Sequence, residues 1–533
     1  MDADYIVVGA GSAGCILAAG LSEGGKNSVI LLEAGPTDRH PYVKIPLGYG
    51  LLFHDKVRNY QYYSVEEPAL NGRQIYIPRG KTVGGSGSIN ALVYFRGMPA
   101  DFESWKSEGL TNWGWENVRP YFEANERRNK SDTGITITDP VSERHPFTKV
   151  FSQAAAELNV RVSDDFNGPN PEGVGYYHIT TRSGFRNTSA DSFLRPALRK
   201  NHVRLLTGAT AQKINITNGV ARSVAFIHKG KLLTATARHG IILSAGAINS
   251  PQLLQVSGIG DPEHLRQIGV ETVLENLNVG AHLQDHLFAG YQYKTNQQTL
   301  NGELYSLTAK THQVLRYFLT RGGPLSNSVN QFGGFVRSSS KIETPNIQLY
   351  FNPATYTISR QKGGVMIQPD PFSGFTLGFQ PTRPTSRGSV KAMSVDISKA
   401  PEIKMNPIST NEDINNIVAG GRYISKFVQS NALSSVISGH LSPSPDTMSD
   451  AEILEDFRER SSSTFHPCGT CRMGTKILNS VVDGNLKVHG LERLFVVDAS
   501  VFPSITSGNT NAPTLMVARY ACDLILRTAS ATE

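Results

Sequence analysis

The chain has little cysteine, no long apolar run and no strong excess of charge of one sign. Its four cysteines are too few to stabilise 533 residues through disulfides, which favours a reducing compartment. No window reaches the roughly 18 consecutive apolar residues that a membrane-spanning helix needs. The first apolar run begins at residue 5, which leaves no room for a secretory signal. We therefore expect a cytoplasmic, or already processed, protein without an integral membrane segment.

Charge and composition exclude further classes of protein. Lysine and arginine exceed aspartate and glutamate by only seven, 52 against 45, and the densest basic patch, residues 126–130, is typical of a solvated face. A nucleic-acid binder would more often carry a basic stripe with stacking aromatics, so no nucleic acid is expected as a partner. The length, a 39% share of hydrophobic residues and an 18% share of charged ones exclude a small module and a disordered chain.

The start of the chain predicts a βαβ unit. An apolar run at residues 5–8 is followed by a glycine turn, an Ala/Leu-rich stretch to Leu21 and a second apolar run at 29–33. Similar apolar runs lie far along the chain, at 203–206, 240–243 and 494–498. Because a parallel sheet needs several such strands buried under helices, we predict one nucleotide-binding sheet assembled from separated segments.

The predicted fold class is α/β, α+β overall, in two domains and without an internal repeat. A Rossmann-like domain takes the discontinuous segments 1–155, 200–291 and 464–533. A second domain, an antiparallel sheet with helices covering one side of the nucleotide site, takes 156–199 and 292–463. Within it, Ser449 and Glu452 have the spacing of a capping box, which predicts the start of a helix there.

Gly9, Gly11 and Gly14 form a G-x-G-x-x-G pattern between the first predicted strand and helix. In that context the first glycine turns tightly, the second lets the backbone approach a pyrophosphate, and the third lets the helix meet the strand. Glu33, at the end of the next strand, is placed to bind ribose hydroxyls, and its charge disfavours NADP. An ordinary glycine turn is the alternative, and the motif alone does not separate NAD from FAD.

A second glycine-rich stretch spans residues 80–90 and has four glycines and three small hydroxyl residues. Without side chains in the way, such a loop presents backbone amides at close range, which suits a second contact with a large cofactor. A plain surface loop is the alternative.

Together these stretches resemble the glucose-methanol-choline oxidoreductase family of FAD enzymes. Residues 80–103 are similar to its first signature and residues 246–260 to its second, and the stretches 279–286 and 466–474 extend the match. The resemblance implies FAD as cofactor. The expected cofactor contacts are Gly9, Gly11, Ser12, Ala13, Gly14, Glu33, Ala34, Lys81, Val83, Gly85, Ser88, Asn90, Ala91, Ala211, Asp498, Ala499 and Asn511. For Asp498 a helix cap is the alternative.

The sequence departs from the family pattern at two positions. The family often has Asn where His282 stands and Ser where Gly87 stands, so local contacts at these positions stay open. Some relatives attach FAD through a histidine, and the matching position here is Ile89. The resemblance therefore implies noncovalent FAD.

The resemblance also implies the catalytic pair. Pro467 biases His466 toward an extended backbone, and His466 matches the catalytic base of the family. The family has a His or Asn fourteen residues before an acid of the last helix, and counting back from Asp523 gives Asn509. Asn511 is the second choice and is expected on the cofactor side, while an Asn-rich turn is the structural alternative for both.

Cys468 and Cys471 form a C-x-x-C pair that suggests other chemistry. A zinc site lacks further convincing ligands, a c-type haem would need His in place of Arg472, and a thioredoxin-like pair would begin a helix. We expect packing cysteines and no metal site.

The predicted function is oxidation of a primary alcohol to an aldehyde by hydride transfer to the flavin, with oxygen or a quinone as acceptor. The alternative is a non-oxidative enzyme on the same scaffold, a hydroxynitrile lyase or a light-driven decarboxylase. A flavin disulfide reductase using Cys468 and Cys471 is more distant, since it would be expected to need NAD(P)H and only one dinucleotide fingerprint is present.

Overall fold

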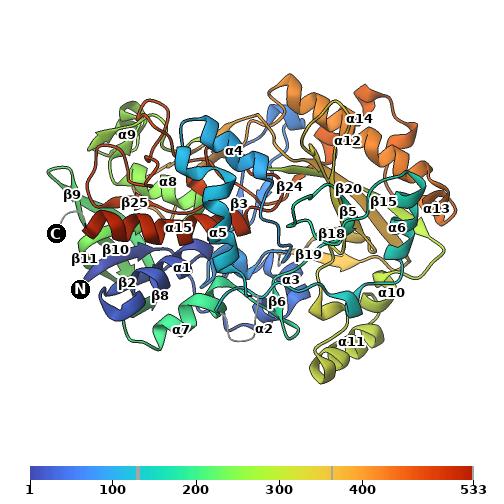
Figure 1. Cartoon of the computed structure of the whole chain (residues 1–533), viewed down its shortest axis with the longest axis horizontal. Helices are drawn as coiled ribbons and strands as arrows, with labels where there is room; N and C mark the ends of the chain where they lie inside the picture. The colour runs from blue at the N-terminus through green and yellow to red at the C-terminus, as the bar shows by residue number, and fades with distance from the viewer. Residues whose placement is uncertain (128–132, 362–363, 531–533) are drawn as a thin grey trace.

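A computed structural model describes residues 1–127, 133–361 and 364–530 of the chain (Figure 1). Two seven-stranded sheets organise it. In the first, β1 pairs in parallel with β2 and β11, β2 with β8, and β11 with β25. β9 and β10 extend it antiparallel. Its strands are β1 (Asp2–Val8), β2 (Val29–Glu33), β8 (Val203–Thr207), β9 (Ala209–Thr217), β10 (Val220–His228), β11 (Lys231–Leu243) and β25 (Leu494–Val496). The Rossmann-like sheet from separated segments is thus confirmed.

The second sheet is antiparallel throughout, as predicted. Its order is β23-β15-β20-β17-β16-β5, and β24 also pairs with β15. The strands are β5 (Gly173–Tyr176), β15 (Leu287–Thr295), β16 (Phe332–Val336), β17 (Ile347–Asn352), β20 (Gly374–Pro381), β23 (Ile437–His440) and β24 (Ser462–Ser463). Glycine-rich β16 lets Tyr177 and neighbouring backbone pack directly against it, since a Cβ on Gly333 would lie 2.0 Å from Leu349 O.

Helices cover both sheets. Helices α1, α15 and α5 pack in series beside the first sheet, and α12 lies on β20 of the second (Figure 1). The helices of eight or more residues are α1 (Ser12–Leu21), α4 (Pro99–Ser107), α5 (Trp115–Asn125), α6 (Thr148–Glu157), α8 (Gly246–Val256), α11 (Leu307–Thr320), α12 (Asn411–Gln429), α14 (Asp450–Arg460) and α15 (Asn511–Ser530). The capping box at Ser449 and Glu452 is present and starts α14. No described helix is long and apolar enough to cross a membrane.

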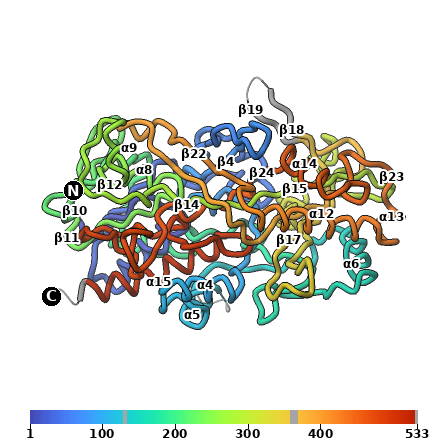
Figure 2. Tube along the Cα trace, turned by 90° about the horizontal axis from the view of Figure 1, so that it is seen from above, coloured from blue at the N-terminus to red at the C-terminus, as the bar shows by residue number. Residues whose placement is uncertain are grey.

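Two large buried clusters correspond to the two sheets. The predicted domain limit at residue 155 falls inside α6, and the limit at 291 falls inside β15. Residues 190–198 form η7 (Ala190–Leu194) and α7 (Arg195–Leu198), whose apolar side chains join the cluster of the first sheet. The start of β1 and the end of α15 lie at the same end of the molecule (Figures 1 and 2).

Candidate functional site

A cavity of about 900 Å³ extends from the glycine turn after β1 to residues of the second sheet. This is near the upper end of the usual range for ligand pockets, about 300–1,000 Å³. Most of the predicted contacts line it: Gly9, Gly11, Ser12, Ala13, Glu33, Ala34, Lys81, Gly85, Asn90, Ala91, Ala211, Asp498, Ala499, Asn511, His466 and Asn509. One cavity therefore brings together residues from both ends of the chain.

In the glycine turn, the surroundings of each glycine agree with the separate role that the motif predicts for it. A Cβ on Gly9 would lie 2.4 Å from Ser244 O, and one on Gly14 would lie 1.8 Å from Gly9 O. At Gly11 the nearest atom would be 3.8 Å away, so this position is open on the cavity side. No side chain caps the start of α1, so its first amides are available to an anion such as a pyrophosphate.

Glu33 lies at the end of β2 and is 5% exposed. Its carboxylate accepts hydrogen bonds from Ala10 N (2.9 Å) and Gly35 N (2.8 Å). Burial raises the pKa of this carboxyl, and these two amides oppose the rise. A carboxylate has about four acceptor sites, so Glu33 can hold the turn and still receive ribose hydroxyls.

The second glycine stretch packs directly on the first. A Cβ on Gly85 would lie 2.7 Å from Gly11 Cα. Ser88 Oγ donates to Val83 O over 2.8 Å, and both residues are buried behind the loop. Val83 and Ser88, like Gly14, therefore support the cavity wall and do not line it.

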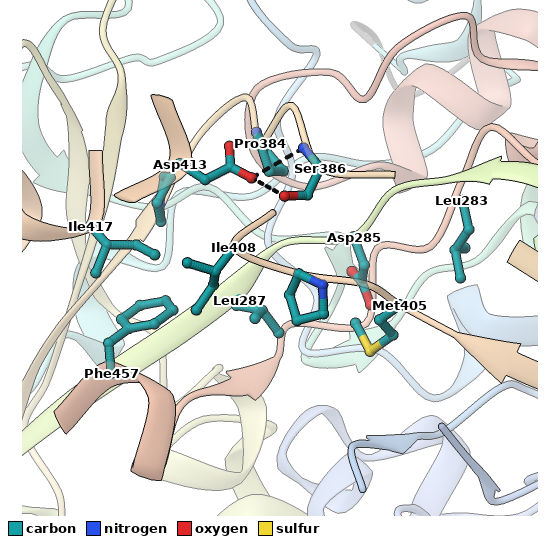
Figure 3. Close-up of a pocket in the computed structure, with 12 residues that line it drawn as sticks. Leu283, Asp285, Leu287, Pro384, Ser386, Met405, Ile408, Asp413, Ile417 and Phe457 are labelled. Carbon is teal, nitrogen blue, oxygen red and sulfur yellow. Dashed lines mark hydrogen bonds between the residues drawn. The ribbon is translucent and has the colours of Figure 1, made fainter. Parts of the chain in front are cut away.

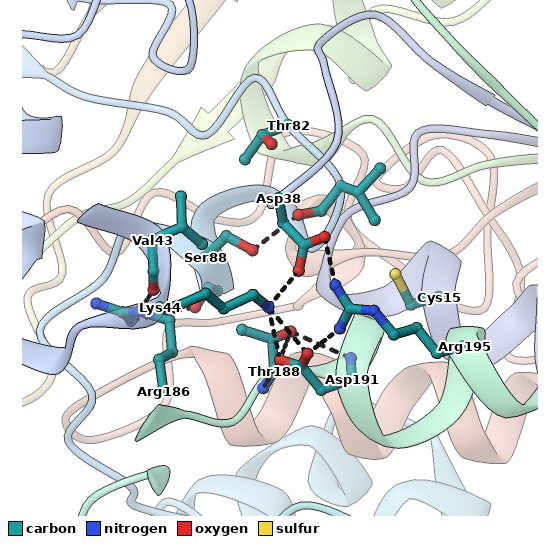
Figure 4. A network of polar contacts seen from close by, with 12 residues as sticks. Cys15, Asp38, Val43, Lys44, Thr82, Ser88, Arg186, Thr188, Asp191 and Arg195 are labelled. Atoms are coloured by element: carbon teal, nitrogen blue, oxygen red, sulfur yellow. Dashed lines mark hydrogen bonds and ion pairs between the residues drawn. The ribbon is translucent and has the colours of Figure 1, made fainter. Parts of the chain in front are cut away.

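A network of ion pairs anchors this wall from outside (Figure 4). Lys44 bridges Asp38 (2.6 Å) and Asp191 (2.9 Å), and Arg195 also binds both carboxylates. Burial alone would raise the pKa of Asp38, but Lys44 and Arg195 bring it below its ordinary value. The network ties the segment after β2 to η7 and α7, which pack against α1.

Asp498 and Asn511 are held by the protein itself. Asp498 accepts from Gly246 N and Ser500 N, both over 2.8 Å, so it caps η10 (Ala499–Val501) and also holds the start of α8. Ser12 Oγ donates to Asn511 Oδ1 over 2.7 Å, joining the first turns of α1 and α15. The cap predicted as the alternative for Asp498 is therefore present, although the residue also borders the cavity.

The two positions of departure, His282 and Gly87, and the position of Ile89 have distinct surroundings. His282 has φ +64°, a left-handed conformation that asparagine tolerates well, and its Nε2 lies 3.0 Å from Asn278 Oδ1. A Cβ on Gly87 would lie 2.8 Å from Ser12 Oγ. Ile89 lines the cavity with a side chain that offers no atom for a covalent bond to a cofactor.

The predicted catalytic pair meets at the other end of the cavity. His466 Nε2 lies 3.1 Å from Asn509 Nδ2, and both residues border the cavity. Asn511 instead contacts Ser12. The structure thus separates the two asparagines as the family count expects.

His286 was missed at the sequence level and fixes the state of His466. His286 Nε2 lies 2.8 Å from Thr382 O, which only accepts, so His286 Nε2 carries the proton. In the neutral ring His286 Nδ1 is then an acceptor, and His466 Nδ1, 3.0 Å away, must donate to it. This leaves a lone pair on His466 Nε2, facing Asn509.

Thr464 supports the same assignment. Its hydroxyl donates to His286 O (3.3 Å), so it can accept from His466 Nδ1 at 3.1 Å. Burial, with His286 and Arg79 adding to it, lowers the pKa of His466 well below its ordinary value. Burial likewise lowers the pKa of His286 to about 4. Both rings are therefore neutral near pH 7.

Asp285 and Arg79, also missed, hold the backbone around His466. Asp285 accepts from His466 N (2.7 Å), and Arg79 donates to Phe465 O (2.7 Å). Burial raises the pKa of Asp285 to about 6. Behind Asp285 lies a separate cavity of about 40 Å³, walled mainly by apolar side chains and by Asp413 (Figure 3). Asp285 lies in the stretch 279–286 that resembles the family, but no motif gave Asp285 or Arg79 a role, because that role follows from three-dimensional proximity.

All four cysteines are buried free thiols. Cys468 and Cys471 are 0% exposed, and burial raises both of their pKa values. Neither borders the large cavity. They pack within the core, as expected, and show no feature of a redox pair.

Family models and known proteins match most of this chain. The N-terminal model of "GMC oxidoreductase" matches residues 3–288 and the C-terminal model matches 384–518. An "Alcohol dehydrogenase [acceptor]" of Pseudomonas putida is 38% identical over 98% of this chain and 96% of that protein. An "Oxygen-dependent choline dehydrogenase" of Vibrio vulnificus is 35% identical over 98% of this chain and 94% of that protein.

Solved structures agree in fold. A pyridoxine 4-oxidase of Mesorbium loti superposes with a TM-score of 0.86 at 28% identity. The match covers 98% of this chain and 98% of that chain. A formate oxidase superposes with a TM-score of 0.90 at 22% identity, covering 100% of this chain and 99% of that chain. The chain therefore belongs to the GMC oxidoreductase family and is an FAD-dependent oxidoreductase.

Proposed function

We propose that this enzyme oxidises a primary alcohol to an aldehyde, with His466 as the base and Asn509 as its partner. The observation that carries the proposal is the pair itself: an unprotonated His466 Nε2 beside the Asn509 amide, both on the wall of the large cavity. FAD supplies the acceptor for the hydride. His466 and Asn509 would act on the alcohol and on its proton.

The cavity fits the cofactor. The amides of the turn at Gly11 and the start of α1 would hold the pyrophosphate, and Glu33 would bind the ribose. The absence of a nucleophilic side chain at Ile89 supports noncovalent binding. This placement leaves His466 and Asn509 at the opposite end for the substrate.

The proton chemistry requires a neutral base. A free hydroxyl is roughly nine pH units less acidic than imidazolium, so full deprotonation before hydride loss would cost about 12 kcal/mol. Proton and hydride loss should therefore be tightly coupled, with the Nε2 lone pair taking the proton as the hydride departs. Because burial keeps the pKa of His466 low, the lone pair is available throughout neutral pH.

Asn509 would position the alcohol. Its amide is uncharged and does not titrate, so it can donate to the same oxygen without competing for the proton. Asn509 Oδ1 is buried and has no partner among the described residues. We infer that a donor group of a bound ligand, other than the hydroxyl whose proton passes to His466, completes this site.

We further propose an uncharged alcohol as substrate. The only carboxylates among the described lining residues are Glu33 and Asp498, and both already accept backbone amides. Four basic residues, Lys56, Arg73, Arg79 and Lys81, line the same cavity. This balance opposes a cationic alcohol such as choline. Phe288 and Tyr350, whose ring centroids lie 5.7 Å apart, form an apolar part of the cavity wall.

Anaerobic titration of the yellow enzyme tests these proposals. Neutral primary alcohols should bleach the visible flavin band, whereas choline should not at equal concentration. Bleaching by no alcohol would favour the lyase or decarboxylase, and bleaching by choline alone would refute the uncharged substrate. Peroxide release after oxygen is admitted would identify an oxidase, and its absence together with reoxidation by a quinone would identify a dehydrogenase.

A further inference from the structure

Helix α11 (Leu307–Thr320) turns apolar side chains toward solvent. Leu307 is 81% exposed, Leu319 74%, Phe318 59%, Leu315 57% and Val314 44%. In a monomeric soluble protein, single exposed apolar residues are ordinary, but five on one short helix require an explanation. We call these five residues the α11 patch.

The α11 patch occupies one side of the helix. At about 100° per residue, its members fall within an arc of about 140°. The residues that face the protein, Gln313 (6% exposed) and Tyr317 (0%), lie on the far side of the helix. Tyr317 donates to Gly184 O over 2.9 Å, which fixes this orientation. The apolar face is therefore presented outward by a helix whose inner side is anchored.

Basic residues border the α11 patch on both sides. On the same helical projection Lys310 lies at one edge, and His312 and Arg316 lie beyond the other, where Arg316 pairs with Glu143 over 3.2 Å. Helix α11 contains no aspartate or glutamate. Arg321, at the C-terminal cap, lies over the rings of Phe185 (4.8 Å) and Phe318 (5.5 Å), so one more cation adjoins the apolar surface.

The helix is also an outlying element. In Figure 1 it forms the lower edge of the second domain, and its packing partners are α10 (Leu300–Leu304) and η8 (Pro324–Ser326). Ser306 Oγ accepts from Ala309 N (3.1 Å) and caps its start. A capped, anchored helix holds its outer face ready before any partner arrives.

We propose that α11 is an interfacial helix that seats the enzyme on an anionic lipid bilayer. An outward apolar arc, cations at its edges and no acidic side chain are the features of helices that lie in the plane of a membrane surface. The apolar side chains would enter the boundary between headgroups and acyl chains, while Lys310 extends to lipid phosphates. This is binding on a membrane surface, which requires no spanning helix.

Charge favours lipid over a second copy of the chain. A symmetric pair of α11 faces would bring the two copies' Lys310 side chains into the same interface, and although Glu143 pairs with Arg316, α11 supplies no carboxylate for Lys310. An anionic bilayer complements both the apolar arc and its cations. From α11 the chain continues through η8 to Val329 and Asn330, which line the large cavity, so the bilayer would lie near one wall of the active site.

Vesicle co-sedimentation of the FAD-loaded enzyme tests the proposal. Wild-type enzyme should sediment with vesicles of phosphatidylcholine and phosphatidylglycerol, less with phosphatidylcholine alone, and less at high salt. The variant Leu315→Ser/Phe318→Ser/Leu319→Ser should bind at least 10-fold more weakly. Lys310→Ala should weaken binding to anionic vesicles by a few-fold and should leave binding to neutral vesicles unchanged.

The matched control is Leu232→Ser/Leu478→Ser, because these leucines are 70% and 88% exposed elsewhere on the molecule. This variant should bind vesicles like wild type. Flavin absorbance, melting temperature and activity on a soluble alcohol should stay normal in every variant, which separates this proposal from the alcohol chemistry. Absence of wild-type vesicle binding would overturn it, as would a dimer in sedimentation velocity that only the α11 variant abolishes.

Discussion

The two ends of the large cavity are built by different means. At the cofactor end the wall is backbone: a Cβ on Gly14 would collide with Gly9 O, and a Cβ on Gly85 would collide with Gly11 Cα. At the substrate end it is a chain of side chains, from Thr382 O through His286 and His466 to Asn509. Cofactor binding thus depends on the absence of side chains at the first end. The chemistry depends on the protonation state of His466 at the second.

The sharpest way to break the first end is Gly14→Ala. The added Cβ would lie 1.8 Å from Gly9 O, so the turn and α1 must separate. We expect a protein that purifies without FAD or does not fold. Gly302→Ala is the matched control, because no atom lies within 4 Å of its Cβ. Full flavin content in Gly14→Ala, measured by absorbance, would show that the close approach is not required.

The second end should break without loss of cofactor. His466→Ala removes the Nε2 lone pair but no part of the glycine wall, so FAD should stay bound while its reduction by alcohol slows at least 100-fold. Stopped-flow absorbance measures the rate. His282→Asn, which suits its left-handed backbone, is the control and should reduce normally. A near-normal rate in His466→Ala would remove the base from the mechanism.

His286→Asn tests whether the histidine chain sets protonation. The wild-type rate should be flat at neutral pH and fall only well below pH 6.5, because His466 must be neutral and its pKa is lowered. Without the His286 ring, we expect about 10-fold slower reduction and an acid limb shifted toward pH 6.5. Unchanged KM for the alcohol would support a positioning role. A rate loss with the wild-type pH profile would indicate a structural effect alone.

The smallest effect concerns stability. Burial lowers the pKa of His286 to about 4, below its ordinary value, so between pH 6.5 and 4 the unfolded chain binds the proton that the folded ring refuses. Stability therefore falls with falling pH, by up to about 1.4 kcal/mol per unit for this ring. Asp285, whose pKa is raised to about 6, acts in the opposite direction. The measurement is therefore the free energy of urea unfolding at several pH values. This free energy should change less with pH in His286→Asn than in wild type.

The same contrast explains how far sequence could predict the site. Short contiguous patterns in the sequence predict the glycine turn, Glu33 and the apolar run at 494–498. His286 gains its role from Thr382, 96 positions away, and from His466, 180 positions away. Arg79 and Asp285 likewise act through backbone atoms that only the fold brings near. No spacing rule joins such residues.

Domain limits failed to match elements for a related reason. Residues 190–198, in η7 and α7, return to pack beside α1, and β15 crosses the limit at 291. A chain that passes repeatedly between two sheets has no single boundary for composition to mark.

The Ser12 to Asn511 hydrogen bond has a consequence for biosynthesis. It joins residues 499 positions apart, and β11 likewise lies between β1 and β25, from opposite ends of the sequence. The turn before α1 must therefore wait until the start of α15 has been synthesised before its pocket can close. We expect flavin to load only after this part of the chain has emerged, because a nascent chain stalled before Asn509 would contain His466 but neither Asn509 nor Asn511.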